Sequence, residues 1–287
     1  MKTRVITAVV GLALLAVALV FYETIWFNIV FLAVCLLAIH ELYAAFGFGK
    51  RDWYLFVALA VMAGVVMLSD NRAAYRAVRP AAYLFVLFLA ICVIGRFSSI
   101  SFEKIAGVVL FSAVVVYCFY SFIHLKVLLP KAQYGYDATY FLILILAYAW
   151  GGDTAAYFVG NAFGKRKLAP RVSPKKTVEG AIGGVLGSMI LGLLVTIIYV
   201  LLSTRLMDFE QVHFMYYVLV CVLGIVASVL GIIGDLFASA VKRQCGIKDF
   251  GTIFPGHGGI LDRFDSVLFI APLVALVVTG LFYRFRL

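Results

Sequence analysis

The chain interrupts its hydrophobic character most sharply at residues 234–265, which read GDLFASAVKRQCGIKDFGTIFPGHGGILDRFD. This stretch holds four of the chain's 14 acidic side chains together with four basic ones. The acidic residues are Asp235, Asp249, Asp262 and Asp265, and the basic residues are Lys242, Arg243, Lys248 and Arg263. Carboxylates suit hard divalent cations, and Lys and Arg suit phosphates. The stretch therefore indicates a site for phosphoryl or nucleotidyl transfer.

The rest of the chain is typical of an integral membrane protein. Of its 287 residues, 65% are hydrophobic and 13% are charged, whereas soluble domains carry about 25% charged residues. Long apolar runs recur from end to end, which excludes a soluble domain held by a single anchor. We expect one integral-membrane domain over residues 1–287, with N-terminal helices of unclear role at 1–138 and a catalytic half at 139–287.

The apolar runs predict an all-α polytopic fold with about nine transmembrane helices and two charged cytoplasmic loops. Most runs hold near 20 residues, enough to cross a hydrocarbon core about 30 Å thick. The third and fourth runs are short. We expect the first run to stay as a helix, because no signal-peptidase-like site follows it. The predicted helices cover residues 5–22, 25–45, 54–68, 80–95, 105–123, 139–161, 181–202, 214–240 and 266–283.

The distribution of basic residues predicts the orientation. With the N-terminus inside, 16 Lys and Arg residues lie on the inner side and 8 on the outer side, as the positive-inside rule requires. Both charged loops, residues 162–180 and 241–265, then face the cytoplasm. The segment with Arg72, Arg76 and Arg79 falls outside and opposes this orientation. The net charge of +10 fits either this bias or an affinity for anionic lipid or nucleotide.

Asp235 lies near the cytoplasmic end of the eighth predicted helix. Ser239, Lys242 and Arg243 follow at i+4, i+7 and i+8, so they share one face with Asp235 if the helix continues. A carboxylate inside a membrane helix costs about 2.5–3.5 kcal/mol and implies a partner or a function. A metal or phosphate site and a simple ion pair, for example between Asp235 and Lys242, are both open.

The segment after this helix is rich in glycine and proline between residues 246 and 259, which excludes a helix there. Glycines allow backbone N–H groups to turn toward a phosphate, although a plain turn has the same composition. Flanked by Lys248, Asp249 and Asp262, the loop predicts a phosphate site. His257 can be a general acid, a phosphate donor or a loop-stabilising residue.

Asp262 and Asp265 lie three residues apart, on one face if the next helix begins there. Mg²⁺ takes one or two carboxylates and keeps its other positions for water and substrate phosphate. The pair therefore predicts metal-assisted in-line displacement at phosphorus. The alternative is a salt bridge from Arg263 at the start of the ninth helix.

The second charged loop contributes four candidate substrate-binding residues. Ser173 and Thr177 can cap the seventh helix, and a helix N-terminus beside Lys175 and Lys176 is a natural anion site. Positive-inside anchoring explains the two lysines equally well.

Polar and small residues outside these motifs are mostly expected to have structural roles. For Asp153, late in the sixth helix, helix pairing and contact with metal or nucleotide are both open. His40 and Glu41 are interpreted as interfacial residues at the end of the second helix. The five scattered cysteines are expected to be free core residues. The glycines of the seventh helix are expected to pack against another helix.

Two segments carry a resemblance to a known family. Ser239-x-Val241-Lys242-Arg243, with the segment from Lys248-Asp249 to Asp265, resembles the signature of the phosphatidate cytidylyltransferases, or CDP-diglyceride synthases. Residues 150–180, WGGDTAAYFVGNAFGKRKLAPRVSPKKTVEG, are similar to the family's other polar stretch. Ala238 departs from the pattern, because members commonly carry Glu there.

The resemblance implies a multi-span enzyme, often a dimer, that condenses CTP with phosphatidic acid to CDP-diacylglycerol and pyrophosphate. It also implies Mg²⁺, alone or with a second cation, at Asp235 and Asp262. The expected partners are CTP, phosphatidic acid, the lipid bilayer and a second copy of the chain, with no nucleic acid. The expected location is the bacterial inner membrane, with the site facing the cytoplasm.

The candidate site residues follow from these motifs. The predicted catalytic residues are Lys248, Asp249, Asp262, Arg263 and Asp265. The predicted substrate-binding residues are Ser173, Lys175, Lys176, Thr177, Ser239, Lys242, Arg243 and His257.

Two alternative functions remain at this point. A CTP-dependent lipid-alcohol kinase would need a base, for which Asp249 or His257 could serve. An anion or lipid transporter would use the same intramembrane charges, but the paired interrupted helices expected of a transporter are absent from the sequence.

Overall fold

The structure, a computed structural model, describes residues 11, 13, 15–69, 72–95, 100–207, 214–254 and 258–285. The chain forms two compact units. The first combines residues 1–127 with 244–264, and the second combines residues 128–243 with 265–287. The segment that carries most of the glycine-rich motif thus packs with the N-terminal helices.

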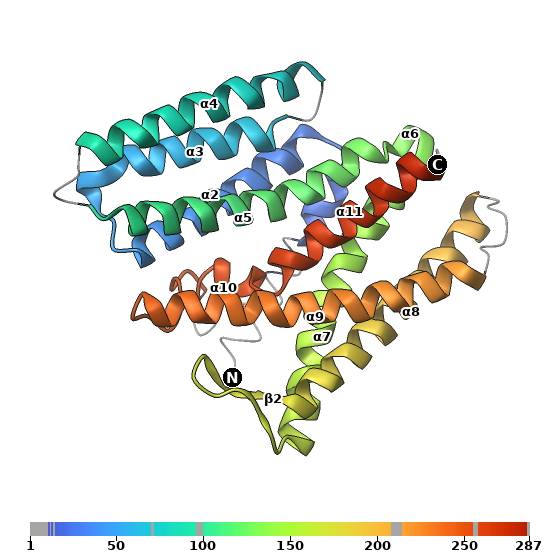
Figure 1. Cartoon of the computed structure of the whole chain (residues 1–287). Helices are drawn as coiled ribbons and strands as arrows, with labels where there is room; N and C mark the ends of the chain where they lie inside the picture. The colour runs from blue at the N-terminus through green and yellow to red at the C-terminus, as the bar shows by residue number, and fades with distance from the viewer. Residues whose placement is uncertain are drawn as a thin grey trace. The chain divides into compact units, whose positions relative to one another are not determined.

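Helices make up nearly all of both units (Figure 1). The first unit contains α2 (Ile25–Ala45), the 3₁₀ helix η1 (Lys50–Asp52), α3 (Trp53–Met67), α4 (Arg72–Gly95), α5 (Phe102–Leu128) and α10 (Leu261–Phe264). The second contains α6 (Lys131–Tyr134), α7 (Asp137–Phe163), β1 (Lys167–Ala169), β2 (Ser173–Thr177), α8 (Val178–Met207), α9 (Phe214–Gln244) and α11 (Val267–Phe285).

The expected polytopic helical fold is confirmed. Among the described residues, six helices are long and apolar enough to cross a membrane, and a shorter apolar segment lies at Val267–Leu281. The count of nine stays a prediction, since the first predicted helix lies partly outside the described residues. α3 holds 15 residues and is therefore about 22 Å long, less than a hydrocarbon core.

α4 begins earlier than the sequence predicted. It starts at Arg72 and runs through Pro80, so Arg76 and Arg79 are helical, and the predicted start of the helix at residue 80 is wrong. Pro80 is the ninth residue of α4, so it lacks the N–H that would bond the carbonyl of Arg76. Membrane helices tolerate such a proline because neighbouring groups re-satisfy the carbonyl that it frees.

Aromatic side chains form the core between α2 and α5 of the first unit. Phe31 of α2 packs edge-on against Phe119 and Phe122 of α5, with ring centroids 5.8 and 5.5 Å away. The hydroxyl of Tyr22 donates to the carbonyl of Phe122 at 2.8 Å. The charged Lys126 is buried in the same core and donates to the side chain of Asn28.

Glycines set the close packing of α7 and α8 in the second unit. A Cβ on Gly187 would lie 2.2 Å from the Cβ of Ala155, and one on Gly183 would lie 2.5 Å from the Cβ of Val159. Such approaches are open only to residues without a side chain. The prediction that these glycines pack against a neighbouring helix is confirmed.

A short antiparallel hairpin joins α7 to α8 and was not predicted (Figure 1). Ser173 begins strand β2, so its expected role as a helix cap is wrong. Thr177 does cap α8, because its Oγ1 accepts the backbone N–H of Gly180 at 3.1 Å. The Glu179 carboxylate accepts the N–H groups of Lys165 and Arg166 and holds the start of the hairpin against α8.

The two ends of the charged stretch 234–265 differ in how well their helices were predicted. α9 is one helix of 31 residues, so the predicted continuation from Asp235 through Arg243 is confirmed. The expectation that Asp262 and Asp265 share one helix is wrong. The four-residue α10 ends at Phe264, and α11 begins only at Val267.

Candidate active site

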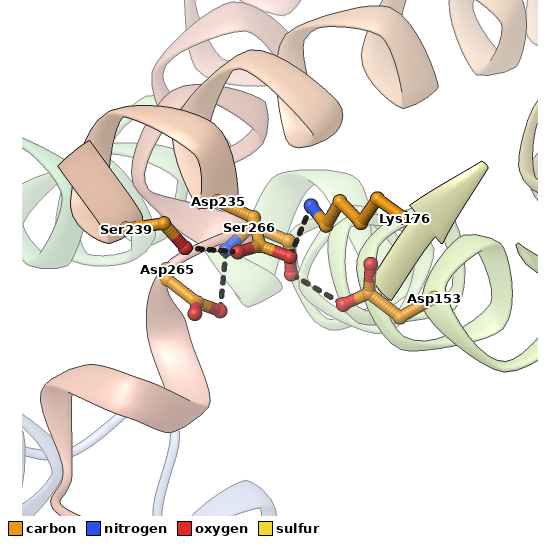
Figure 2. Close-up of polar contacts among 6 residues, drawn as sticks. All are labelled: Asp153, Lys176, Asp235, Ser239, Asp265 and Ser266. Atoms are coloured by element: carbon orange, nitrogen blue, oxygen red, sulfur yellow. Dashed lines mark hydrogen bonds and ion pairs between the residues drawn. The ribbon is translucent and has the colours of Figure 1, made fainter. Parts of the chain in front are cut away.

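Polar side chains from three elements and from the short segment before α11 meet in the second unit (Figure 2). The cluster, here called the carboxylate cluster, consists of Asp153 of α7, Lys176 of β2, Asp235 and Ser239 of α9, and Asp265 and Ser266 before α11.

Asp235 is held from two sides within the carboxylate cluster. Its Oδ2 forms an ion pair with Lys176 Nζ, and its Oδ1 accepts the hydroxyl of Ser239 at 3.2 Å. Lys176 and Asp235 are 26% and 23% exposed, so a ligand can still reach both. The structure thus joins a carboxylate of helix α9 to a lysine of the charged loop 162–180.

Ser266 links the other two carboxylates of the cluster. Its backbone N–H donates to Asp265 Oδ1 at 3.0 Å, and its hydroxyl donates to Asp153 Oδ2 at 2.8 Å. Burial, and then the negative charges of Asp235 and Asp153, raise the pKa of the Asp265 carboxyl to about 7, although the charge of Lys242 opposes this. The cluster holds three carboxylates and a single lysine, Lys176.

Glycines bring α9 against the turn that carries Asp265. A Cβ on Gly234 would lie 2.6 Å from the backbone oxygen of Asp265, and one on Gly231 would lie 2.9 Å from the side chain of Ile270. The close approach depends on the absence of side chains at both positions. The glycine that precedes Asp235 thus positions this carboxylate beside Asp265.

The carboxylates of the cluster fit a hard cation that a substrate helps to hold. Among the residues that the structure describes, no group of three or more acidic, His or Cys side chains is placed to bind a metal without help. Mg²⁺ commonly takes one or two carboxylates and completes its shell with water and phosphate oxygens. The assignment of the metal to Asp235 and Asp262 stays a prediction.

Asp262 organises the glycine-rich loop in the first unit. Its Oδ2 accepts the backbone N–H of Phe250 at 2.8 Å and that of Gly259 at 2.9 Å, and the residue is only 6% exposed. Gly258 has a φ of 85°, a conformation that favours glycine. A Cβ there would also lie 2.8 Å from Asp262 Oδ2.

Glu41 binds the same loop from α2. Its Oε1 accepts the N–H of Ile260 at 2.9 Å, and its Oε2 accepts the N–H of Leu261 at 3.0 Å. Glu41 is 4% exposed, so it is buried in the protein, and the interfacial position of His40 and Glu41 stays a prediction. His40 is exposed, with its ring near Phe56. The cost of a carboxylate in a helix as apolar as α2 was the signal that could have identified Glu41.

These contacts change the interpretation of the glycine-rich loop. Four backbone N–H groups, those of Phe250, Gly259, Ile260 and Leu261, donate to protein carboxylates. The sequence had suggested that such groups bind phosphate. In the described part of the loop, the glycines make room for Asp262 and Glu41.

The other predicted site residues occupy varied positions. Lys175, Arg243, Lys248, Asp249 and Arg263 are exposed, whereas Ser239 and Lys242 are 8% and 7% exposed. Ala238, where the resembling family commonly carries Glu, is completely buried. His257 lies outside the described residues.

Comparison with known proteins agrees with these features. A model of the cytidylyltransferase family matches residues 2–281. The phosphatidate cytidylyltransferase of Thermotoga maritima is 32% identical over 283 residues, which cover 96% of both chains.

Two other relatives match over shorter segments. The phosphatidate cytidylyltransferase of Bacillus subtilis is 36% identical over 67% of this chain, and that of Aquifex aeolicus is 42% identical over 49%. The chain spans 64% and 48% of the length of these two relatives. The match over residues 2–281 shows that the chain belongs to the cytidylyltransferase family.

Proposed function

We propose that the protein is a phosphatidate cytidylyltransferase, which condenses CTP with phosphatidic acid to CDP-diacylglycerol and pyrophosphate. The observation that carries the proposal is the 32% identity to the Thermotoga protein of that name over 96% of both chains. The ion pair between Lys176 and Asp235 supports it, since it joins a cation of the family-like segment 150–180 to a carboxylate of the charged stretch 234–265.

The proposed reaction is an in-line displacement at phosphorus. A phosphate oxygen of phosphatidic acid forms a bond to the α-phosphorus of CTP, and the bond from that phosphorus to the bridging oxygen of the β-phosphate breaks. The electron pair leaves with pyrophosphate. Because the attacking phosphate is already ionised near pH 7, the step needs no base.

Charge repulsion between the two anionic substrates is the main obstacle to this reaction. Lys176 and Lys242 provide positive charge beside the carboxylate cluster. Asp235 and Asp262 are the proposed Mg²⁺ ligands, and the bound ion would supply further neutralisation of phosphate charge. Ser239 orients the carboxylate of Asp235 through its hydrogen bond.

The proposed setting is the bacterial inner membrane, with the carboxylate cluster at the cytoplasmic face. The six apolar helices support a multi-pass membrane protein, and the excess of Lys and Arg in the inner segments supports this orientation. A lipid substrate would then reach the site from the bilayer. A homodimer stays a prediction.

The test is an assay of the purified protein with phosphatidic acid, CTP and Mg²⁺. We expect the lipid product to carry label from base-labelled CTP and none from γ-labelled CTP. Transfer of the γ-label to lipid would instead identify a lipid kinase and overturn the proposal. Absence of both labels from lipid under conditions in which the Thermotoga protein is active would overturn it as well.

A further inference from the structure

Glu41 lies far in sequence from both family-like segments, yet it contacts the centre of one of them. Its carboxylate accepts the N–H groups of Ile260 and Leu261, which lie 219 and 220 residues further along the chain. We propose that Glu41 is a positioning residue, which fixes residues 250–254 and 258–261 of the loop and through them the carboxylate of Asp262. This inference rests on the proposed function, in which Asp262 acts at the reaction site.

The two hydrogen bonds require both oxygens of a carboxylate. Oε1 accepts one N–H group and Oε2 accepts the next one along the chain. Glutamine has the same shape but would place an NH₂ donor against one of these N–H donors. At a residue that is 4% exposed, water has little access to satisfy the displaced donor, so the loss is larger than one hydrogen bond.

The glycines of the loop are shaped around Glu41. A Cβ on Gly251 would lie 2.2 Å from Glu41 Oε1, and a Cβ on Gly259 would lie 2.4 Å from both of its oxygens. The carboxylate therefore lies between two stretches of loop backbone that only glycine can form at this distance. A side chain at Gly251 or Gly259 would therefore displace the Glu41 carboxylate.

The same loop carries the donors that orient Asp262. Gly259 donates its N–H to Asp262 Oδ2, and the adjacent Ile260 donates to Glu41. Phe250, the other donor to Asp262, packs edge-on against Phe111 with ring centroids 5.8 Å apart. Loss of the Glu41 contact would thus loosen the hydrogen bond from Gly259 to Asp262, while packing against Phe111 keeps the other donor, Phe250, in place.

The first test compares Glu41→Gln with Glu103→Gln, a control at an exposed first-turn carboxylate of α5. In Glu41→Gln we expect backbone amide exchange in residues 250–261 to rise about tenfold or more. Exchange in α2 and α5 should stay as in the unsubstituted protein. We expect kcat to fall about 10- to 100-fold, as for other groups that orient a functional carboxylate, with a KM for CTP changed less than kcat.

Gly251→Ala disturbs the same contact from the loop side. Its control is Gly49→Ala, because Gly49 lies in the same unit, has an extended φ of −130° and has open space around its Cβ position. We expect Gly251→Ala to reproduce the rise in exchange and the loss of kcat, and Gly49→Ala to do neither. Both substitutions disturb the same contact, that between Glu41 and the loop. The effects of Glu41→Gln and Gly251→Ala should therefore not add in the double variant.

Several outcomes would overturn the positioning role. One is unchanged exchange in residues 250–261 together with unchanged kcat in both variants. Another is a loss of protection throughout α2 and α5, which would show a general structural role for Glu41. If Glu41→Gln does not fold, Gly251→Ala decides by the same two readouts. An unsubstituted protein without cytidylyl transfer would overturn the proposed function alone, because the exchange comparison needs no substrate.

Discussion

Lys176 is the residue whose role can be tested most directly. It is a half-buried cation paired with Asp235, and the proposed reaction brings two anionic substrates to it. In Lys176→Gln we expect kcat/KM for CTP to fall about 10- to 100-fold, because a hydrogen bond to a charged group contributes about 1.5–3 kcal/mol. Steady-state kinetics of the purified variant measure the effect.

Lys167→Gln provides the matched control for Lys176. Lys167 lies in strand β1 of the same hairpin, and its side chain is exposed. The control should keep the kinetics of the unsubstituted protein. Equal losses in the two variants would mean that overall positive charge, rather than the pair with Asp235, assists the reaction.

Asp262 has two roles, hydrogen bonding within the loop and the proposed binding of Mg²⁺, and substitution by asparagine separates them. In Asp262→Asn the amide oxygen can still accept the N–H groups of Phe250 and Gly259, which now donate to a single carboxylate oxygen. The negative charge is lost. We therefore expect a folded protein with normal amide exchange in the loop and with Mg²⁺-dependent kcat lowered about 100-fold. Near-normal turnover would contradict the metal assignment.

At the scale of single residues, the sequence predicted which charges matter better than it predicted their partners. The cost of charge in an apolar helix singled out Asp235, and the lysine that pairs with it was already a candidate. The pairing itself depends on the hairpin, which lies in a polar segment without apolar alternation. The contact of Glu41 with the loop was not predicted, because its donors are backbone groups more than 200 residues away, which leave no side-chain signal in the sequence.

The packing of α7 against α8 is the interaction to test at the scale of helices. In Gly187→Ala the new methyl group would lie 2.2 Å from the Cβ of Ala155. The helices must separate or shift, which costs about 1–3 kcal/mol. We expect a lower midpoint of thermal unfolding in detergent, measured by circular dichroism.

Gly280→Ala is the control for this substitution. Gly280 lies in α11 of the same unit and has open space where a Cβ would be added. Because alanine favours helix over glycine, the midpoint should stay the same or rise. A Gly187→Ala variant as stable as Gly280→Ala would show that the two helices tolerate a wider separation.

The membrane-spanning helices could be predicted from the sequence because they are long and apolar. The predicted membrane run ends at residue 240 and α9 ends at Gln244, since the hydrophobic run stops before the hydrogen-bonded helix does. The break between α10 and α11 could not be predicted in the same way. It falls at Asp265 and Ser266, where the Ser266 hydroxyl donates to Asp153 of α7, a tertiary contact that the local sequence does not show.

At the scale of the whole molecule, the arrangement of helix ends gives a prediction about the membrane. Within the second unit, Lys176 joins the hairpin to α9, and Ser266 joins the start of α11 to Asp153 of α7. Asp153 lies in the second half of α7 (Asp137–Phe163), so these contacts lie toward the C-terminal end of that helix. Gln133 precedes the 27-residue α7, which is about 40 Å long, so it lies at the other end.

Cysteine labelling can test which end faces the cytoplasm. In a variant with the five native cysteines replaced, we expect Lys167→Cys and Gln244→Cys to react with a membrane-impermeant maleimide only in inverted membrane vesicles. Gln133→Cys, also exposed, should react only in intact spheroplasts. This pattern follows from the excess of Lys and Arg in the inner segments. Labelling of Lys167→Cys in spheroplasts would reverse the orientation and place the carboxylate cluster away from cytoplasmic CTP, which would also contradict the proposed reaction.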